Sequence, residues 1–114
     1  MIVLLILNAV VAIAGVAFSL IGGFRPEALS ESGKPTAGER FYGWMYATRG
    51  VPLGVTAGLA PLVWTVPATV LLLLAAAAAQ VGDVTIGVAT RKWTMIAGAS
   101  VATAVHVVTA VAVR

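Results

Sequence analysis

The sequence predicts an all-α membrane protein, folded as a single bundle of four transmembrane helices. Of its 114 residues, 61% are hydrophobic and only 10% are charged, and the mean hydropathy is +1.04. A soluble domain of this size could not cover so much apolar surface with so few charges. Four apolar stretches of about 20 residues match a hydrocarbon core of about 30 Å, at about 1.5 Å of rise per residue. One bundle accounts for residues 1–114, and we expect no second domain within them.

The first expected span covers residues 2–22 and is interrupted only by Asn8, Gly15 and Ser19. The competing interpretation is a signal peptide, whose apolar region of about 7–15 residues follows a positively charged start. This stretch is longer, and no Lys or Arg precedes it. We therefore expect a retained transmembrane helix.

Residues 23–41 form the expected polar loop, which is long for so small a bundle. Its Gly, Pro and Ser residues are typical of a loop, with a short helical turn expected after Pro26. Loops of this length are often lids or binding loops, and an ordinary disordered connector remains the alternative.

The second expected span covers residues 42–62 and contains Arg49 and Pro52. Proline lacks a backbone N–H and crowds the carbonyl four residues earlier, so we expect a kink that frees the carbonyl of Thr48. Pro61 and the residues up to Pro67 predict a tight turn, with Thr65 or Val66 near the N-cap of the next helix.

The third and fourth spans are expected at residues 67–89 and 93–113, joined by residues 90–92. Gln80 and Asp83 interrupt the third span. Small and polar side chains recur in the fourth, which carries Ser100, Thr103, His106 and Thr109. Small residues at helix faces permit close packing in a membrane.

Basic residues predict the orientation. The loops at 23–41 and 90–92 lie on one side and hold Arg25, Lys34, Arg40, Arg91 and Lys92, whereas the other side has Arg114 alone. The positive-inside rule therefore places both loops in the cytoplasm of a multi-pass cell-membrane protein and both termini outside. The net charge of +3 sits in ones and twos beside apolar segments, which favours lipid headgroups over nucleic acid as the partner.

An Arg49–Asp83 ion pair is the strongest structural prediction from the sequence. Arg49 lies seven residues inward from Tyr42, and Asp83 lies seven residues inward from Thr90. Both are therefore expected about 10 Å below the inner boundary, on different helices. Each charge alone in the hydrocarbon would be uncompensated, and an ionisable residue there is by default a candidate functional residue.

Helical spacing places further polar residues on inward faces. Tyr42 and Tyr46 share a stripe with Arg49, and Asn8 and His106 are expected to form a second polar level in the outer half. The candidate catalytic residues are Asp83, Arg49, Tyr46 and His106. The candidate substrate-binding residues are Asn8, Tyr42, Trp44, Thr56 and Gln80. The alternatives left open are an ion pair that only fixes helix register, hydrogen-bonded interior roles for Asn8 and His106, and headgroup-belt roles for the tyrosines.

Several classes of chemistry are excluded or unexpected. The chain contains no cysteine, which rules out disulfides, thiolate catalysis and cysteine metal sites. One His and one Asp at different depths do not make a metal site. No phosphate loop, nucleotide fingerprint or nucleophile elbow is present, so we expect neither metal nor cofactor.

The segment Phe41-Tyr42-Gly43, Arg49-Gly50 and Gly54, followed by Asp83 on the third helix and His106 on the fourth, resembles the DoxX-like group of small four-helix membrane proteins. Within that group the chain is most similar to the uncharacterised DUF4267 family. The resemblance covers most of the chain from Phe41 onward. It implies a four-helix bundle with an Arg on helix two and an Asp on helix three, and it supplies no activity.

Three hypotheses for function follow from these residues. The first is an enzyme for a lipophilic small molecule, in which Asp83 performs acid–base chemistry such as isomerisation, cyclisation or epoxide opening. The second is a small proton-coupled transporter of hydrophobic compounds, although the helix-one glutamate of the small multidrug exporters is replaced here by Asn8. The third is a non-catalytic subunit of a membrane complex. A homodimer is left open for each of them.

Overall fold

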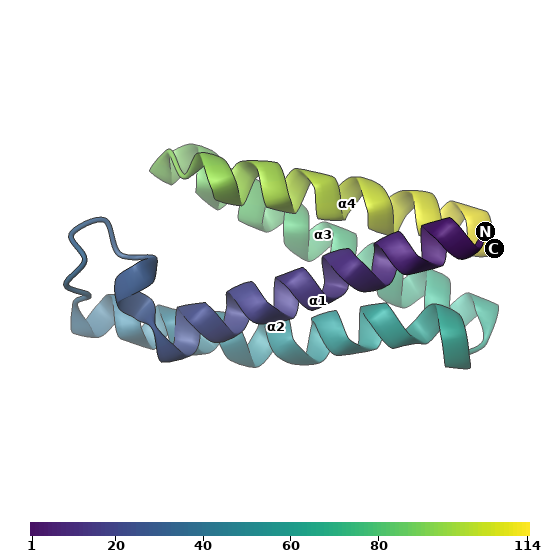
Figure 1. Ribbon diagram of the computed structural model, residues 1–114, viewed down its shortest axis with the longest axis horizontal. Helices are drawn as coiled ribbons and strands as arrows, with labels where there is room; N and C mark the ends of the chain where they lie inside the picture. Colours follow the sequence, from purple (N-terminus) through teal and green to yellow (C-terminus); the bar gives the residue numbers. More distant parts are fainter.

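The computed structural model describes all of residues 1–114, and the chain is entirely helical, as predicted (Figure 1). The elements in order are α1 (Ile2–Phe24), the 3-10 turn η1 (Pro26–Ala28), α2 (Ala37–Val63), α3 (Val66–Thr90) and α4 (Trp93–Val113). Three of the helices, α1, α3 and α4, are long and apolar enough to cross a membrane. The chain is therefore a multi-pass membrane protein. α2, which carries three charged side chains, is not among these three helices.

The helices form two antiparallel hairpins, α1 with α2 and α3 with α4, and most contacts between helices lie within these pairs. Figure 1 shows the hairpins close together at the end that holds both termini and spread apart at the end that holds the loop. The bundle measures 44 × 22 × 19 Å. Its shape is therefore a wedge whose wide end lies beside residues 25–36.

α2 begins at Ala37, earlier than the expected residue 42, because a capping box starts it. The Thr36 hydroxyl accepts a hydrogen bond from the Glu39 amide at 3.1 Å, and the Glu39 carboxylate accepts one from the Thr36 amide at 2.6 Å. This reciprocal arrangement satisfies two otherwise free donors of the first turn. Residues 37–41, expected in the polar loop, are consequently helical.

Glycines set the close approach of α1 and α2. A Cβ on Gly43 would collide with the backbone carbonyl of Gly22, and one on Gly50 would collide with the hydroxyl of Ser19. A Cβ on Gly54 would lie 2.6 Å from Val16. The absence of a side chain at these three positions lets the two helix backbones touch, as small residues do in membrane helix pairs.

Both prolines of α2 lie inside the helix, and Pro61 has the clearer structural consequence. Pro61 lacks an N–H, so the carbonyl of Ala57, four residues earlier, has no partner within the helix. The side chain of Asn8 on α1 donates to this carbonyl at 2.9 Å. α2 continues through Pro61 to Val63, so the turn is shorter than expected, and Thr65 is the N-cap of α3 as predicted.

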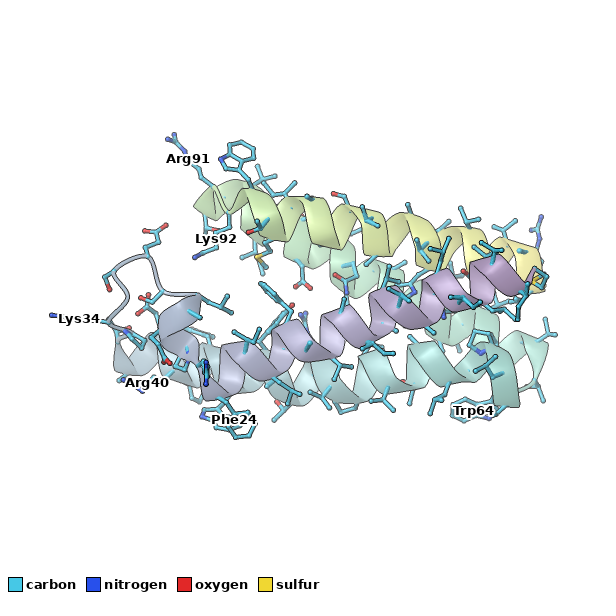
Figure 2. The ribbon with its side chains drawn as sticks, viewed as in Figure 1. Phe24, Lys34, Arg40, Trp64, Arg91 and Lys92 are labelled. Carbon is cyan, nitrogen blue, oxygen red and sulfur yellow. The ribbon has the colours of Figure 1, made fainter.

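The basic residues gather at the wide end of the wedge. Figure 2 shows Lys34, Arg40, Arg91 and Lys92 at this end, with Trp64 at the opposite end. The ammonium group of Lys92 donates to the carbonyl of Leu29 at 2.6 Å and so ties the loop to the turn between α3 and α4.

Candidate functional site

The predicted ion pair between Arg49 and Asp83 is confirmed. Nη2 of Arg49 lies 2.9 Å from Oδ1 of Asp83, which joins the middle of α2 to α3. The Asp83 side chain is only 4% exposed, whereas that of Arg49 is 46% exposed. The guanidinium of Arg49 also lies over the ring of Tyr46, 5.1 Å from its centroid, which adds a cation–π contact.

The two oxygens of Asp83 have different surroundings. Oδ1 accepts the bond from Arg49, and Oδ2 makes no hydrogen bond with the protein. Every fully buried side-chain nitrogen and oxygen of the chain has a hydrogen-bond partner. Oδ2 is therefore in contact with open space, and the Tyr46 hydroxyl lies close to the carboxylate.

Asp83 lines two cavities, and the larger of them, of about 430 Å³ between α1 and α4, we call the chamber. Ligand cavities typically span about 300–1,000 Å³, so the chamber suits a small molecule. Its walls are mainly apolar, with the polar side chains of Tyr46, Gln80 and Asp83 on the α2 and α3 side. It is lined by Val11, Ala14, Gly15, Phe18, Tyr46, Gln80, Asp83, Thr94, Met95, Ala97, Gly98, Ala99, Val101 and Ala102.

A second cavity of about 420 Å³, the vestibule, lies at the wide end below the loop. It is more polar than the chamber, with glutamate, lysine, serine and threonine among its lining residues. These residues are Phe18, Gly22, Pro26, Leu29, Ser30, Glu31, Glu39, Gly43, Tyr46, Ile86, Thr90, Lys92 and Met95. Phe18, Tyr46 and Met95 line both cavities and form the partition between them. The rings of Phe18 and Tyr46 meet edge to face, with centroids 6.1 Å apart.

Asn8 and His106 form a buried polar layer nearer the termini. Nδ1 of His106 lies 2.8 Å from Oδ1 of Asn8, and Nδ2 of Asn8 donates to the Ala57 carbonyl. A carbonyl can only accept, so the Asn8 amide must present its NH₂ to Ala57 and its oxygen to His106. Nδ1 of His106 therefore carries the hydrogen and donates it. This chain of bonds links α4, α1 and α2.

The structure brings some predicted site residues together and separates others. Tyr46, Gln80 and Asp83 line the chamber, and Arg49 lies directly behind Asp83. Asn8 is fully buried, and both ends of its amide are engaged within the bundle, so it presents no free group to the chamber.

Three residues predicted to bind substrate lie away from the chamber. Tyr42 is 68% exposed and packs against Phe41. Trp44 packs edge to face on Phe24, 4.8 Å between ring centroids. The Thr56 hydroxyl donates to the carbonyl of Pro52 at 2.7 Å. These positions follow from the α1–α2 contact, which turns the other faces of α2 outward.

Phe18, Met95 and Gly98 belong to the chamber and were not predicted from the sequence. Their side chains are the ordinary apolar and small ones of membrane helices, so composition gives no signal for them. The polar residues Ser100 and Thr103 of the fourth expected span are not among the chamber residues of α4. Only the measured approach of α1 to α4 identifies this wall.

No protein-family model, curated protein or solved structure matches the chain. The resemblance to the DoxX-like group accordingly stays a prediction. No three His, Asp or Glu side chains gather at one point of the structure.

Proposed function

We propose that this chain is a four-span membrane enzyme that acts on a lipophilic small molecule by acid–base chemistry. The observation that carries the proposal is the carboxylate of Asp83, which Arg49 holds by Oδ1 and which is open at Oδ2. It forms part of the wall of an apolar chamber of about 430 Å³ inside the bundle. The ligand is expected in this chamber.

Connectivity supports α2 as the fourth span. α1 ends at the wide end of the wedge and α3 begins at the opposite end, so the segment between them has to cross the same distance (Figure 1). α2 makes this crossing with 27 residues, and its charged residues Glu39 and Arg40 lie in its first turn. The basic residues at the wide end (Figure 2) support a cytoplasmic position for that end, with both termini outside.

The ion pair supplies the chemistry. The Arg49 guanidinium at 2.9 Å balances the charge of the Asp83 carboxylate, to which we assign the role of the base. The Tyr46 side chain lies beside Asp83 at the chamber wall and carries an O–H donor. A base and a donor at one end of an apolar chamber are the groups that proton-transfer catalysis requires.

Isomerisation by proton shift is the reaction that these groups support most directly. Oδ2 of Asp83 takes a proton from a carbon next to a carbonyl, and the electron pair moves onto the carbonyl oxygen. The Tyr46 hydroxyl donates a hydrogen bond to that oxygen. Asp83 then returns the proton to a different carbon of the conjugated system. The substrate and product are isomers, so no co-reactant is needed. Cyclisation and epoxide opening use the same base and donor.

The test is turnover by purified protein in lipid nanodiscs, with a panel of β,γ-unsaturated ketones, polyenes and terpenoid epoxides as substrates. Asp83→Asn keeps the shape and removes the base, so we expect turnover to fall at least a hundredfold while the protein stays folded. Full turnover in folded Asp83→Asn protein would end the proposal.

A matched pair of glycine variants tests the chamber itself. Gly98 lines the chamber and a Cβ there meets nothing within 4 Å, so Gly98→Leu adds a bulky side chain at the chamber wall. Gly82 also has open space around it and lies outside the chamber. We expect Gly98→Leu to abolish binding of the best substrate and Gly82→Leu to leave binding unchanged. Equal effects of the two variants would place the ligand elsewhere.

Proton-coupled transport is a second candidate, favoured by the wedge shape and by the partition between vestibule and chamber. A change in Phe18, Tyr46 or Met95 would join the two cavities. Proteoliposomes under an imposed pH gradient distinguish the candidates. Uptake of a hydrophobic dye that depends on Asp83 supports transport, whereas turnover without uptake supports the enzyme.

A further inference from the structure

A third, much smaller cavity of about 30 Å³ lies between the Arg49–Asp83 pair and the Asn8–His106 layer, and we call it the inner cavity. Half of its lining residues are alanine or glycine. The polar side chains that reach it are Ser19, Tyr46, Arg49, Gln80, Asp83 and His106. The inner cavity therefore connects the candidate catalytic carboxylate to the only histidine of the chain.

His106 has one ring nitrogen without a protein partner. Its Nδ1 donates to Asn8, and Nε2, which then carries a lone pair, makes no hydrogen bond. The residue is only 2% exposed, yet no fully buried side-chain nitrogen is unpaired. Nε2 consequently touches open space inside the bundle, and of the vestibule, the chamber and the inner cavity, His106 lines only the inner cavity.

The size and the polarity of the inner cavity suit water. A cavity needs about 10–15 Å³ of space for the centre of a water molecule in order to hold one, and that water needs two to four polar partners. Nε2 of His106, the amide of Gln80 and the carboxylate of Asp83 supply acceptors and donors from α4 and α3. An empty inner cavity would leave the Nε2 lone pair without a hydrogen bond.

We propose that the inner cavity binds water that hydrogen-bonds Nε2 of His106 and links it to Asp83. The further step, which rests on the proposed function, gives this water a role in proton transfer. The proton that Asp83 takes from the substrate passes to the water, and the water gives one of its own protons to Nε2. His106 becomes an imidazolium whose Nδ1–H still bonds Asn8, Asp83 is ionised again, and the reverse steps return the proton.

The test uses ¹⁵N-histidine-labelled protein in lipid bilayers, studied by solid-state NMR. One histidine gives one pair of ring signals. We expect a protonated Nδ1 and an unprotonated Nε2, with magnetisation transfer from water protons to Nε2. A protonated Nε2 in the resting protein, or an Nε2 without contact to water, would overturn the proposal.

Two alanine variants supply the matched control. Gly15 lines both the inner cavity and the chamber, and its Cβ would lie 3.8 Å from Gln80, so Gly15→Ala adds a methyl group at this point without a clash. Gly98→Ala adds the same group to the chamber alone. We expect the water contact of Nε2 to be lost in Gly15→Ala and retained in Gly98→Ala. Equal water contact in both variants would show that the water lies elsewhere.

The link to Asp83 has its own readout. Asp83→Asn is expected to shift the Nε2 signal and to leave the Nδ1 signal in place, because Nδ1 bonds Asn8 and not the inner cavity. An unchanged Nε2 signal contradicts the link, and the unchanged Nδ1 signal shows that the layer is still folded. These spectra need no substrate, so they test the water site whatever the outcome of the turnover experiments.

Discussion

Asp83 is more deeply buried than Arg49, and this difference determines how much a substitution of each residue destabilises the protein. Asp83 is almost wholly enclosed by protein, whereas nearly half of the Arg49 side chain is exposed. An arginine in a membrane helix can extend toward the headgroups, and a helical side chain leans toward the N-terminus of its helix. For Arg49 the N-terminus of α2 lies at the end that we expect in the cytoplasm, so its side chain can extend toward those headgroups. The enclosed side chain of Asp83 cannot reach them.

Removal of Arg49 is therefore expected to destabilise the protein more than removal of Asp83. Loss of one partner of a buried pair costs about 3–5 kcal/mol, and the exposure of Arg49 places Arg49→Gln near the lower end. Asp83→Asn keeps an acceptor and leaves an exposed cation, so its cost should be about 1–2 kcal/mol. Unfolding in mixed micelles measures both free energies.

The double variant Arg49→Gln/Asp83→Asn completes this cycle. Its cost should be smaller than the sum of the two single costs, because no unpaired carboxylate remains buried. Strict additivity would mean that the 2.9 Å contact contributes no coupling between α2 and α3.

At the scale of elements, α2 depends on its neighbours at the positions where its own hydrogen bonds are missing. Pro61 frees the Ala57 carbonyl, and Asn8 from α1 occupies it. The sequence placed Asn8 and His106 at a common depth, which the structure confirms with a hydrogen bond. The sequence predicted an effect of Pro52, because Pro52 lies close to Arg49 along the chain. The contact of Asn8 with Ala57 joins residues 49 positions apart, so it cannot be seen in the sequence.

Substitution of Asn8 should depend on whether Pro61 is present. Asn8→Leu leaves both the Ala57 carbonyl and Nδ1–H of His106 without partners, at an expected cost of about 2–4 kcal/mol. Pro61→Ala restores an N–H that can bond the Ala57 carbonyl within α2. The cost of Asn8→Leu should therefore fall by about 1 kcal/mol in a Pro61→Ala background. An undiminished cost, measured by the same unfolding assay, would mean that Asn8 acts through His106 alone.

The crossing of α1 and α2 should tolerate no side chain at Gly43. Its Cβ would meet the backbone carbonyl of Gly22, which cannot rotate away as a side chain can. We expect Gly43→Ala to destabilise the protein by about 1–3 kcal/mol, the range for overpacked cores. Gly82→Ala, which meets open space, is the matched control and should be neutral or slightly stabilising.

At the scale of the whole molecule, the sequence predicted the helices and the ion pair better than the cavities. Helix ends follow from local signals such as Pro67 and Thr65, and the pair follows from counting depth along two spans. The chamber depends on the angle between the hairpins, whereas the contacts at Gly43, Gly50 and Gly54 set the approach of α1 and α2 within one hairpin. Successive residues turn by about 100° around a helix, so four residues leave an offset of about 40° and ten leave about 80°. These offsets take Tyr42 and Thr56 off the face that Tyr46 occupies.

The proposed topology gives a prediction for the complete bundle. A reporter that is active only in the cytoplasm should be inactive when fused to either terminus and active when inserted at Gly33, the tip of the loop. Opposite results for the two termini would mean that α2 does not cross the membrane and that three spans remain. A reporter that is active at both termini and inactive at Gly33 would reverse the orientation in the membrane without changing the number of spans.

Both ends of the chain lie at the narrow end of the wedge (Figure 1). The order of the helices along the chain could therefore be changed without changing how the helices pack. A short linker from Arg114 to Met1, with new ends opened at Gly33, would give a circular permutant that begins with α2 and ends with α1. Each helix, the ion pair and the chamber would keep their neighbours, and the permutant would let α1 insert last, after its three partners are in place.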